Sequence, residues 1–309
     1  MKIALYNLEP KYKNLALEKL RKFYSNYEVE DYFPLRHNSY DIIYCSSIFD
    51  YTNKENLPPN IIKGGTGFDL TIKLPEYIEQ VNPHLNFGFT SRGCIRKCKF
   101  CLVPEKEGYV RATNDLLDLW DKKAKIVTLF DNNILALPTH FEKICKQARE
   151  NKLRLDFNQG LDHRLLTPEI VNLLTSISHH EYRFAFDNIK SANTVIRAIE
   201  LLQSKGINRC LWYVLVGFDS TFKKDLERIN FLRDHNQIAY VMRYKNGTKN
   251  AKDDKLIALA RWVNQPHIFR GMTWLQFINH PGNKTYYKLF DTLEKEETVL
   301  IKGKNIVLQ

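Results

Sequence analysis

Three cysteines stand close together in this chain, in the string Cys94-Ile-Arg-Lys-Cys98-Lys-Phe-Cys101. Three thiolates on one short loop can hold three irons of a cubic 4Fe–4S cluster, because cysteine sulfur is the usual protein ligand of such clusters. No fourth cysteine follows nearby, so one iron would be left open to bind a small molecule. The spacing CxxxCxxC therefore predicts an iron–sulfur cluster with one open iron.

Other uses of the three thiols fit the spacing less well. A structural zinc site needs four ligands, commonly in two CxxC or HxxxH pairs, and no second pair follows. A thioredoxin-like CxxC motif would leave Cys94 unexplained. A disulfide is disfavoured because three is an odd number and intracellular thiols stay reduced. Zinc binding, redox chemistry and packing remain the alternatives. The other cysteines have apolar neighbours and are predicted to be small core residues: Cys45, Cys145 and Cys210.

At these residues the chain resembles the radical SAM superfamily, whose signature is CxxxCxxC with an aromatic residue before the last cysteine, as Phe100 is here. The resemblance covers roughly Leu85 to Tyr244. It implies that S-adenosylmethionine (SAM) chelates the open iron, that one electron from the cluster cleaves the sulfonium, and that the resulting 5′-deoxyadenosyl radical abstracts hydrogen from a substrate. It also implies a reductant such as flavodoxin or ferredoxin, and leaves open whether the overall reaction is that of an oxidoreductase or a transferase.

Strand-like and helix-like segments alternate along the chain. A first group predicts a small parallel sheet, with strands at 2–7, 40–46 and 60–63 and a helix at 14–24. A second group predicts strands at 87–90, 124–130, 153–158, 182–187, 210–216 and 237–243, with helices at 141–151, 168–177, 192–205 and 222–235. Repeated βα units of this kind form barrels.

The predicted fold is therefore α/β: a partial TIM-like (β/α) barrel of the radical SAM type, preceded by a small Rossmann-like α/β domain. The predicted domains are 1–84, 85–245 and 246–309, the last a helical extension that includes a helix at 254–263. The first domain resembles a shortened cobalamin-binding-type domain. Its cobalt-ligating DxHxxG motif is absent, since Asn38-Ser39 follow His37, so cobalamin is not expected. The glycines of Gly64-Gly65-Thr66-Gly67 predict a tight turn.

Polar residues follow most of the predicted barrel strands, and in a barrel such positions converge on one mouth. The resemblance places Asp131 and Asn132 at the acidic strand end that faces SAM, and Val216 and Gly217 beside the adenine. The full set of candidate cofactor residues is Phe100, Asp131, Asn132, Asn158, Asp187, Val216 and Gly217. The alternative is that Asp131, Asn158 and Asp187 cap helices or turns. The candidate substrate residues are Arg111, His163, Arg164 and Arg243.

Composition indicates an ordinary globular protein, with 44% hydrophobic and 26% charged residues. No run reaches the ~18 apolar residues of a membrane span, and the N-terminus enters a strand at once, so a cytoplasmic location is expected. The net charge of +11 favours a nucleotide or nucleic acid as substrate, although the positive charge is dispersed. The competing hypothesis is a non-catalytic nucleic-acid-binding or scaffold protein with a cysteine-ligated metal knuckle.

Overall fold

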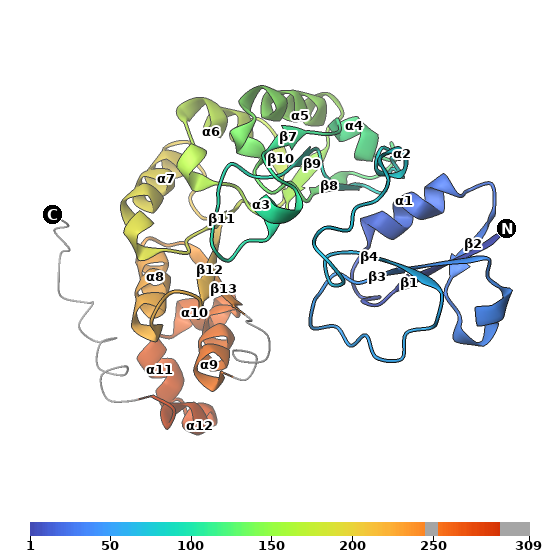
Figure 1. Ribbon diagram of the computed structural model, residues 1–309. Coiled ribbons are helices and arrows are strands. Elements are labelled where there is room, and N and C mark those ends of the chain that lie inside the picture. The colour runs from blue at the N-terminus through green and yellow to red at the C-terminus, as the bar shows by residue number, and fades with distance from the viewer. Residues whose placement is uncertain (245–252, 291–309) are drawn as a thin grey trace. The chain divides into compact units, whose positions relative to one another are not determined.

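The computed structural model describes residues 1–244 and 253–290 (Figure 1). The chain divides into two compact units. The first consists of Met1–His140 with Glu150–Leu153, and the second of Phe141–Arg149 with the described residues from Arg154 onward.

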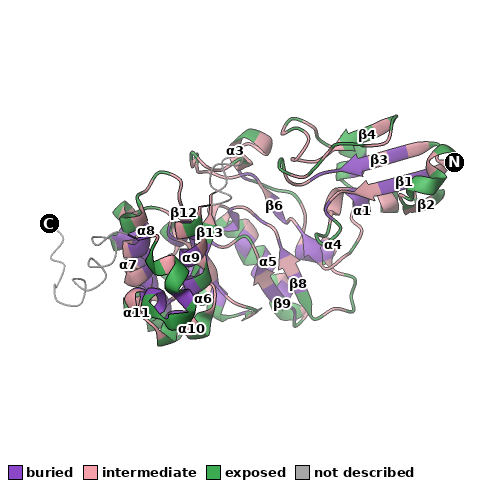
Figure 2. Cartoon of the chain, turned by 90° about the horizontal axis from the view of Figure 1, so that it is seen from below, coloured by how far each residue is buried: buried purple, intermediate pink, exposed green. Residues whose placement is uncertain are grey.

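The first unit begins with a parallel sheet of four strands in the order β2-β1-β3-β4. Its elements, in chain order, are β1 (Lys2–Asn7), α1 (Leu15–Phe23), β2 (Glu28–Asp31), a 3₁₀ helix (Pro34–Ser39), β3 (Ile42–Ser46), β4 (Ile61–Gly64) and α2 (Glu76–Glu79). Figure 2 shows buried stretches along β1 and β3. Asn14 caps the N-terminus of α1, since its side chain accepts a hydrogen bond from the backbone of Leu17. The apolar face of α1 packs on β1.

The strands predicted at 2–7, 40–46 and 60–63 are thus present to within two residues. Strand β2 was not predicted, because Glu-Val-Glu-Asp lacks the apolar alternation of a half-buried strand and lies at the sheet edge. The glycines after β4 form the expected tight turn. A Cβ atom on Gly65 would lie 2.2 Å from the carbonyl oxygen of Ser47, and one on Gly67 would lie 2.4 Å from that of Phe49.

The rest of the first unit carries Cys94, Cys98 and Cys101. Strands β5 (Phe87–Gly88) and β8 (Ile126–Leu129) pair in parallel, and β6 (Ser91–Arg92) and β7 (Arg111–Ala112) form an antiparallel pair. Two short helices, α3 (Val103–Lys106) and α4 (Leu116–Leu119), complete it, with a 3₁₀ turn after β8 at Ile134–Ala136.

The second unit contains two groups of parallel strands, β9 (Arg154–Phe157) with β10 (Ser178–His179), and β11 (Arg183–Ala185) with β12 (Leu211–Val216) and β13 (Ile238–Arg243). Most of α5 (Pro138–Glu150) belongs to this unit and precedes β9. The helices between the strands are α6 (Pro168–Thr175), α7 (Ala192–Ser204) and α8 (Phe222–Asp234), and 3₁₀ turns lie at His163–Leu165 and Ile189–Ser191. Thr167 caps α6, since its side chain accepts from the backbone of Ile170.

The described C-terminal part is helical, with α9 (Asp254–Val263), α10 (Pro266–Gly271), α11 (Trp274–Asn279), a 3₁₀ turn (Pro281–Asn283) and α12 (Lys284–Tyr287). Its aromatic residues form a core, in which the ring centroids of Trp262 and Trp274 lie 5.5 Å apart. The chain is thus a mixed α/β protein with several parallel sheets, as predicted. The barrel and the Rossmann-like type remain predictions. No helix within residues 1–244 and 253–290 is long and apolar enough to cross a membrane.

Candidate functional site

The three clustered cysteines lie on one loop, which the β6–β7 pair closes at its base. Gly93 opens this cysteine loop (residues 93–110) with φ +82°, and a Cβ atom there would lie 2.3 Å from the carbonyl oxygen of Tyr109. The backbone amide of Cys94 donates to the carbonyl of Gly108 at 3.1 Å. The two ends of the loop are therefore held together by backbone contacts that leave no space for a side chain at position 93.

All three cysteines of the loop are half-buried. The sulfur of Cys94 accepts hydrogen bonds from the backbone amide of Arg96 at 3.3 Å and from Nδ2 of Asn133 at 3.4 Å. The amide of Cys101 donates to the carbonyl of Cys98 at 3.0 Å. Hydrogen bonds to sulfur ligands are one of the means by which proteins tune iron–sulfur clusters. The surroundings of Cys94 thus suit a sulfur that carries negative charge.

The remaining cysteines occupy different surroundings. Cys45, Cys145 and Cys210 are each at most 1% exposed, as the sequence predicted. Burial raises the pKa of the Cys45 thiol to about 11, and those of Cys145 and Cys210 to about 12. Because the thiolate is the metal ligand, these three residues are poorly suited to bind iron.

The three loop sulfurs do not form a ready-made metal site. Over residues 1–244 and 253–290, no group of three or more His, Cys, Asp or Glu side chains is arranged so that it could hold a metal ion. The donor set and its half-buried position fit an iron–sulfur cluster, but the sulfurs would have to move together to bind it. Phe100 is half-buried on the same loop.

Asp131, at the end of β8, is 4% exposed and serves the backbone. Its carboxylate accepts from the amide and hydroxyl of Thr90, at 3.1 and 2.7 Å, and from the amide and hydroxyl of Ser91, both at 2.5 Å. Desolvation raises its pKa, against the effect of these donors. Asp131 therefore ties the end of β8 to the segment that leads into the cysteine loop.

Glu107 is a site residue that the sequence did not single out. One of its carboxylate oxygens accepts from the amide of Gly93 at 3.0 Å and from Nδ2 of Asn132 at 2.8 Å, and the other accepts from Arg92 at 2.8 Å. The one local signal for it was an acidic residue beside Gly108, in a loop rich in Lys and Arg. Asn132, predicted to contact SAM, is thus bonded to the cysteine loop.

In the second unit, the candidate cofactor residues lie at the ends of β9, β11 and β12. Asp187 is half-buried and accepts from the backbone amide of Leu215 at 3.0 Å, and burial raises its pKa. The backbone carbonyl of Asn158 accepts from the Tyr213 hydroxyl at 3.1 Å. Val216 is fully buried, and Gly217 turns the chain with φ +76°. Each residue therefore takes part in the backbone structure at a strand end.

A buried ion pair supports these strand ends. Asp225 and Arg228 of α8 are each 1% exposed and lie 2.5 Å apart. Arg228 donates to the carbonyl of Phe186 at 2.7 Å and to that of Leu215 at 2.8 Å, while Asp225 accepts from the amide of Gly217 at 3.1 Å. The pair therefore satisfies backbone groups that follow β11 and lie at the end of β12.

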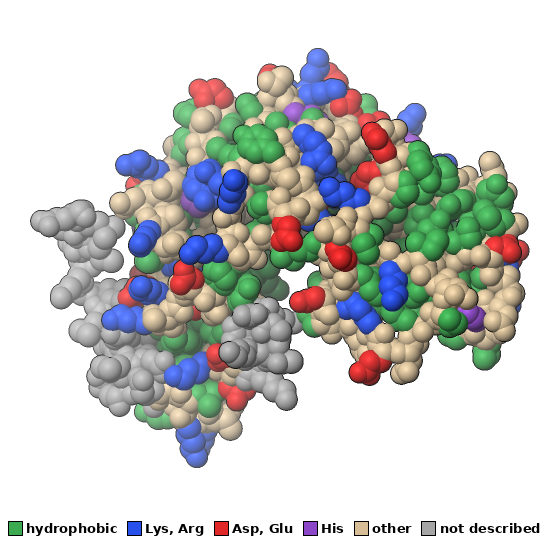
Figure 3. All heavy atoms as spheres, in the orientation of Figure 1, with side chains coloured by type: hydrophobic (Ala, Val, Ile, Leu, Met, Phe, Trp, Pro, Cys, Tyr) green, Lys and Arg blue, Asp and Glu red, His purple; other side chains and the backbone are tan. Residues whose placement is uncertain are grey.

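The candidate substrate residues lie in varied places. Arg111 is exposed and donates to the carbonyl of Glu107 at 2.7 Å. His163 is 7% exposed, with its ring centroid 5.6 Å from that of Trp212. Arg164 is exposed and pairs with Asp162 at 2.6 Å. Arg243 is half-buried opposite Val216 in the β12–β13 register. On the face shown in Figure 3, Lys and Arg stand in small groups with Asp and Glu among them.

No protein-family model matches the chain in sequence comparisons, and no curated protein is significantly similar to it. What the chain does is therefore inferred from its own residues.

Proposed function

We propose that this chain is a radical SAM enzyme, which binds a 4Fe–4S cluster through Cys94, Cys98 and Cys101 and uses it to cleave SAM reductively. The observation that carries the proposal is the contrast between two sets of cysteines. The three on the cysteine loop are half-buried, and the sulfur of Cys94 already receives two N–H donors. The other three lie in the core with raised thiol pKa values.

The surrounding residues would hold the loop in place. Asn133 and the amide of Arg96 donate to the Cys94 sulfur, and Asp131 fixes the segment before the loop through Thr90 and Ser91. When bound, the cluster would supply the electron that cleaves SAM and so starts hydrogen abstraction from the substrate. The protein's share of the work is to bind, orient and exclude water.

We also propose the finer fold that this function implies, a partial TIM-like barrel of the radical SAM type after a Rossmann-like domain. The parallel strands β9 to β13, with polar residues at their ends, support it. A nucleotide or nucleic acid is the proposed substrate class, supported by the net charge of +11. A reductant of the flavodoxin or ferredoxin type would supply the electrons.

Anaerobic reconstitution with iron and sulfide tests the proposal. We expect about four irons per chain, as one cubane implies, the brown absorbance of a cluster, and 5′-deoxyadenosine and methionine when the protein is reduced with SAM. Ala variants of Cys94, Cys98 or Cys101 should lose the iron.

The matched controls are Ala variants of Cys45, Cys145 and Cys210, which should keep it. Stoichiometric zinc in a colourless protein, with no iron uptake and no 5′-deoxyadenosine, would replace the proposal by the metal-knuckle hypothesis.

A further inference from the structure

A continuous chain of opposite charges joins α1, which packs on the N-terminal sheet (β1 to β4), to the cysteine loop within the first unit. Lys19 of α1 lies 3.2 Å from Glu79, at the end of α2. Glu79 lies 3.0 Å from Arg92 of β6, and Arg92 lies 2.8 Å from Glu107. Cations and carboxylates therefore alternate along the chain, and Arg92 is the link between its two carboxylates.

The end of this charge chain meets the cysteine loop at Cys94. Glu107 accepts from the amide of Gly93, the residue before Cys94. It also accepts from Asn132, whose neighbour Asn133 donates to the Cys94 sulfur. One carboxylate thus contacts both the backbone that leads into Cys94 and the residue next to the sulfur's own donor.

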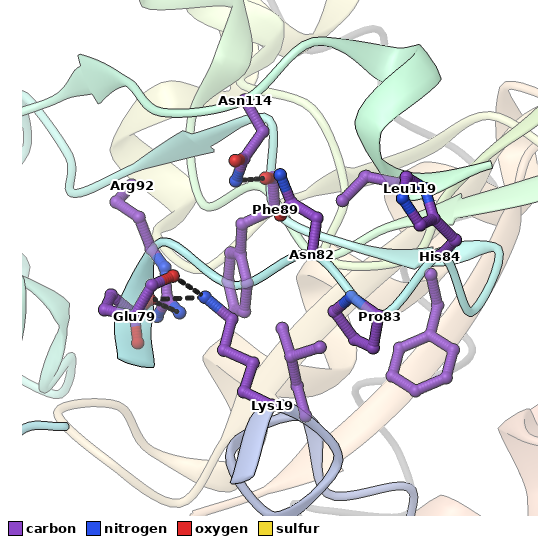
Figure 4. Close-up of a pocket in the computed structure, with 11 residues that line it drawn as sticks. Lys19, Glu79, Asn82, Pro83, His84, Phe89, Arg92, Asn114 and Leu119 are labelled. Carbon is purple, nitrogen blue, oxygen red and sulfur yellow. Dashed lines mark hydrogen bonds and ion pairs between the residues drawn. The ribbon is translucent and has the colours of Figure 1, made fainter. Parts of the chain in front are cut away.

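Arg92 is placed for this role by its packing as well as by its charge. Its guanidinium lies 3.7 Å from the centroid of the Phe89 ring, and its side chain is 21% exposed. A planar fork can contact two carboxylates and an aromatic face at once, which a lysine ammonium cannot do in the same way. Figure 4 shows Lys19 and Arg92 both directed at Glu79, with Phe89 beside them.

These residues enclose very little free space. The hollow that they line has a volume of about 10 Å³, roughly enough for one water molecule. A second contact links the cysteine loop to the segment that follows β4, since the ammonium of Lys106 on α3 lies 3.4 Å from the carbonyl of Leu70. The contact region is therefore closely packed.

We propose that Arg92 is a positioning residue, which with Glu107 sets the conformation of the cysteine loop, and that Lys19 and Glu79 make the N-terminal sheet a support for that loop. This role in cluster binding rests on the proposed function. Supporting the cysteine loop is a structural role, for which the N-terminal sheet needs no cofactor of its own.

Hydrogen–deuterium exchange on the cluster-free protein tests the loop conformation directly. Arg92→Gln should speed exchange of peptides covering residues 93–110 roughly tenfold or more, because the half-buried charge-assisted contact with Glu107 is lost. Glu107→Ala should do the same. Lys19→Met should speed exchange at residues 76–80 and, to a smaller extent, at 93–110.

Arg21→Gln is the matched control. Arg21 lies on the same helix as Lys19, and the substitution breaks its exposed ion pair with Asp31 of β2. In this variant the cysteine loop should exchange as in the wild type. Unchanged exchange at 93–110 in Arg92→Gln would overturn the positioning role, and an effect of Lys19→Met confined to α1 would overturn the support role of the sheet.

A second measurement addresses the cluster. Reconstituted Arg92→Gln should lose iron to a chelator several times faster than the wild type, while Arg21→Gln should not. Equal rates of iron loss would overturn the link to the cluster. If the wild type itself takes up no iron, the proposed function fails, whereas the exchange result still decides whether Arg92 sets the loop conformation.

Discussion

Replacing Arg228 by methionine would leave the buried carboxylate of Asp225 without its cationic partner. Both side chains are 1% exposed, so water cannot compensate for the loss. The carbonyl oxygens of Phe186 and Leu215 would lose their donors in the same step. Removing one partner of a buried ion pair costs about 3–5 kcal/mol, and we expect a loss of unfolding free energy in that range at pH 8.

The loss should depend on pH in a defined direction. Burial already raises the pKa of Asp225 despite the nearby Arg228, and without that cation it should rise further. A group whose pKa is raised on folding contributes stability that is fully present below its unfolded pKa and is lost as the pH rises through the folded value. The variant should therefore be less destabilised at pH 5 than at pH 8, by up to about 1.4 kcal/mol per pH unit of titration.

Urea unfolding followed by tryptophan fluorescence suits this test, because Trp212, Trp262 and Trp274 all lie in the second unit. The double variant Asp225→Leu/Arg228→Met removes the titrating group, so its destabilisation should depend less on pH than that of the single variant. Lys224→Met, on the exposed side of the same helix, should stay within about 0.5 kcal/mol of the wild type. A loss below about 1 kcal/mol, or one that is the same at both pH values in the single variant, would refute the reasoning.

Three further outcomes follow from the structure. Gly93→Ala should lower iron uptake, because the new Cβ atom would meet the carbonyl of Tyr109. Gly108→Ala is the control, since Gly108 also has positive φ but a Cβ atom there would meet nothing within 4 Å, and this variant should take up more iron than Gly93→Ala. Equal iron uptake by the two variants would contradict the steric argument. Burial opposes the charge of Glu9, but hydrogen bonds from Thr52, Ile48, Ser47 and Phe49 outweigh it and lower its pKa below the ordinary 4.5. Glu9→Gln should therefore cost about 1–3 kcal/mol at pH 7, and this difference should shrink as the pH falls through the lowered pKa in urea unfolding; a difference that grows on acidification would contradict it. Asn158→Ala should weaken SAM binding roughly tenfold with an unchanged melting temperature, whereas Asp187→Ala should lower both the SAM affinity and the melting temperature. Calorimetry measures the affinity and thermal melts measure the stability. A lower melting temperature in Asn158→Ala would give that residue a structural role.

The regular elements were predictable because their signals are local. Apolar periodicity located the long helices, including α6 and α9, whose N-terminal caps in the structure are Thr167 and Asp253. The strands that escaped prediction are two to four residues long: β2, β6, β7 and β10. Segments of that length carry too few residues for a periodicity, and their pairing is decided by neighbours far along the chain.

The site residues that could be predicted are likewise those whose relation is local in the sequence. Spacing alone located Cys94, Cys98 and Cys101, since their relation is confined to eight residues. The contact between Lys19 and Glu79 joins residues 60 positions apart, and nothing local distinguishes either from a solvated surface charge. The pair Asp225 and Arg228 has the i, i+3 spacing of a helical ion pair, yet its burial depends on the strands that α8 covers.

The acidic residues that follow strands all accept hydrogen bonds from backbone amides. Asp131 accepts from the backbone at Thr90 and Ser91, Asp187 from Leu215, and Glu9 from Ile48 and Phe49. Asp131 and Glu9 each accept from several donors, so they have little left to offer a ligand, and moving them would expose backbone amides, whereas Asp187 accepts from one backbone amide. Asn158 differs, because its side-chain amide makes no hydrogen bond within the described residues, while its backbone carbonyl is already paired. Position after a strand therefore indicates a backbone tie as readily as a ligand contact, and what separates the two is whether the side chain is already satisfied. By that criterion Asn158 is a stronger candidate than Asp131 for direct contact in the proposed SAM site, whereas Asp131 is bonded to Thr90 and Ser91 before the cysteine loop.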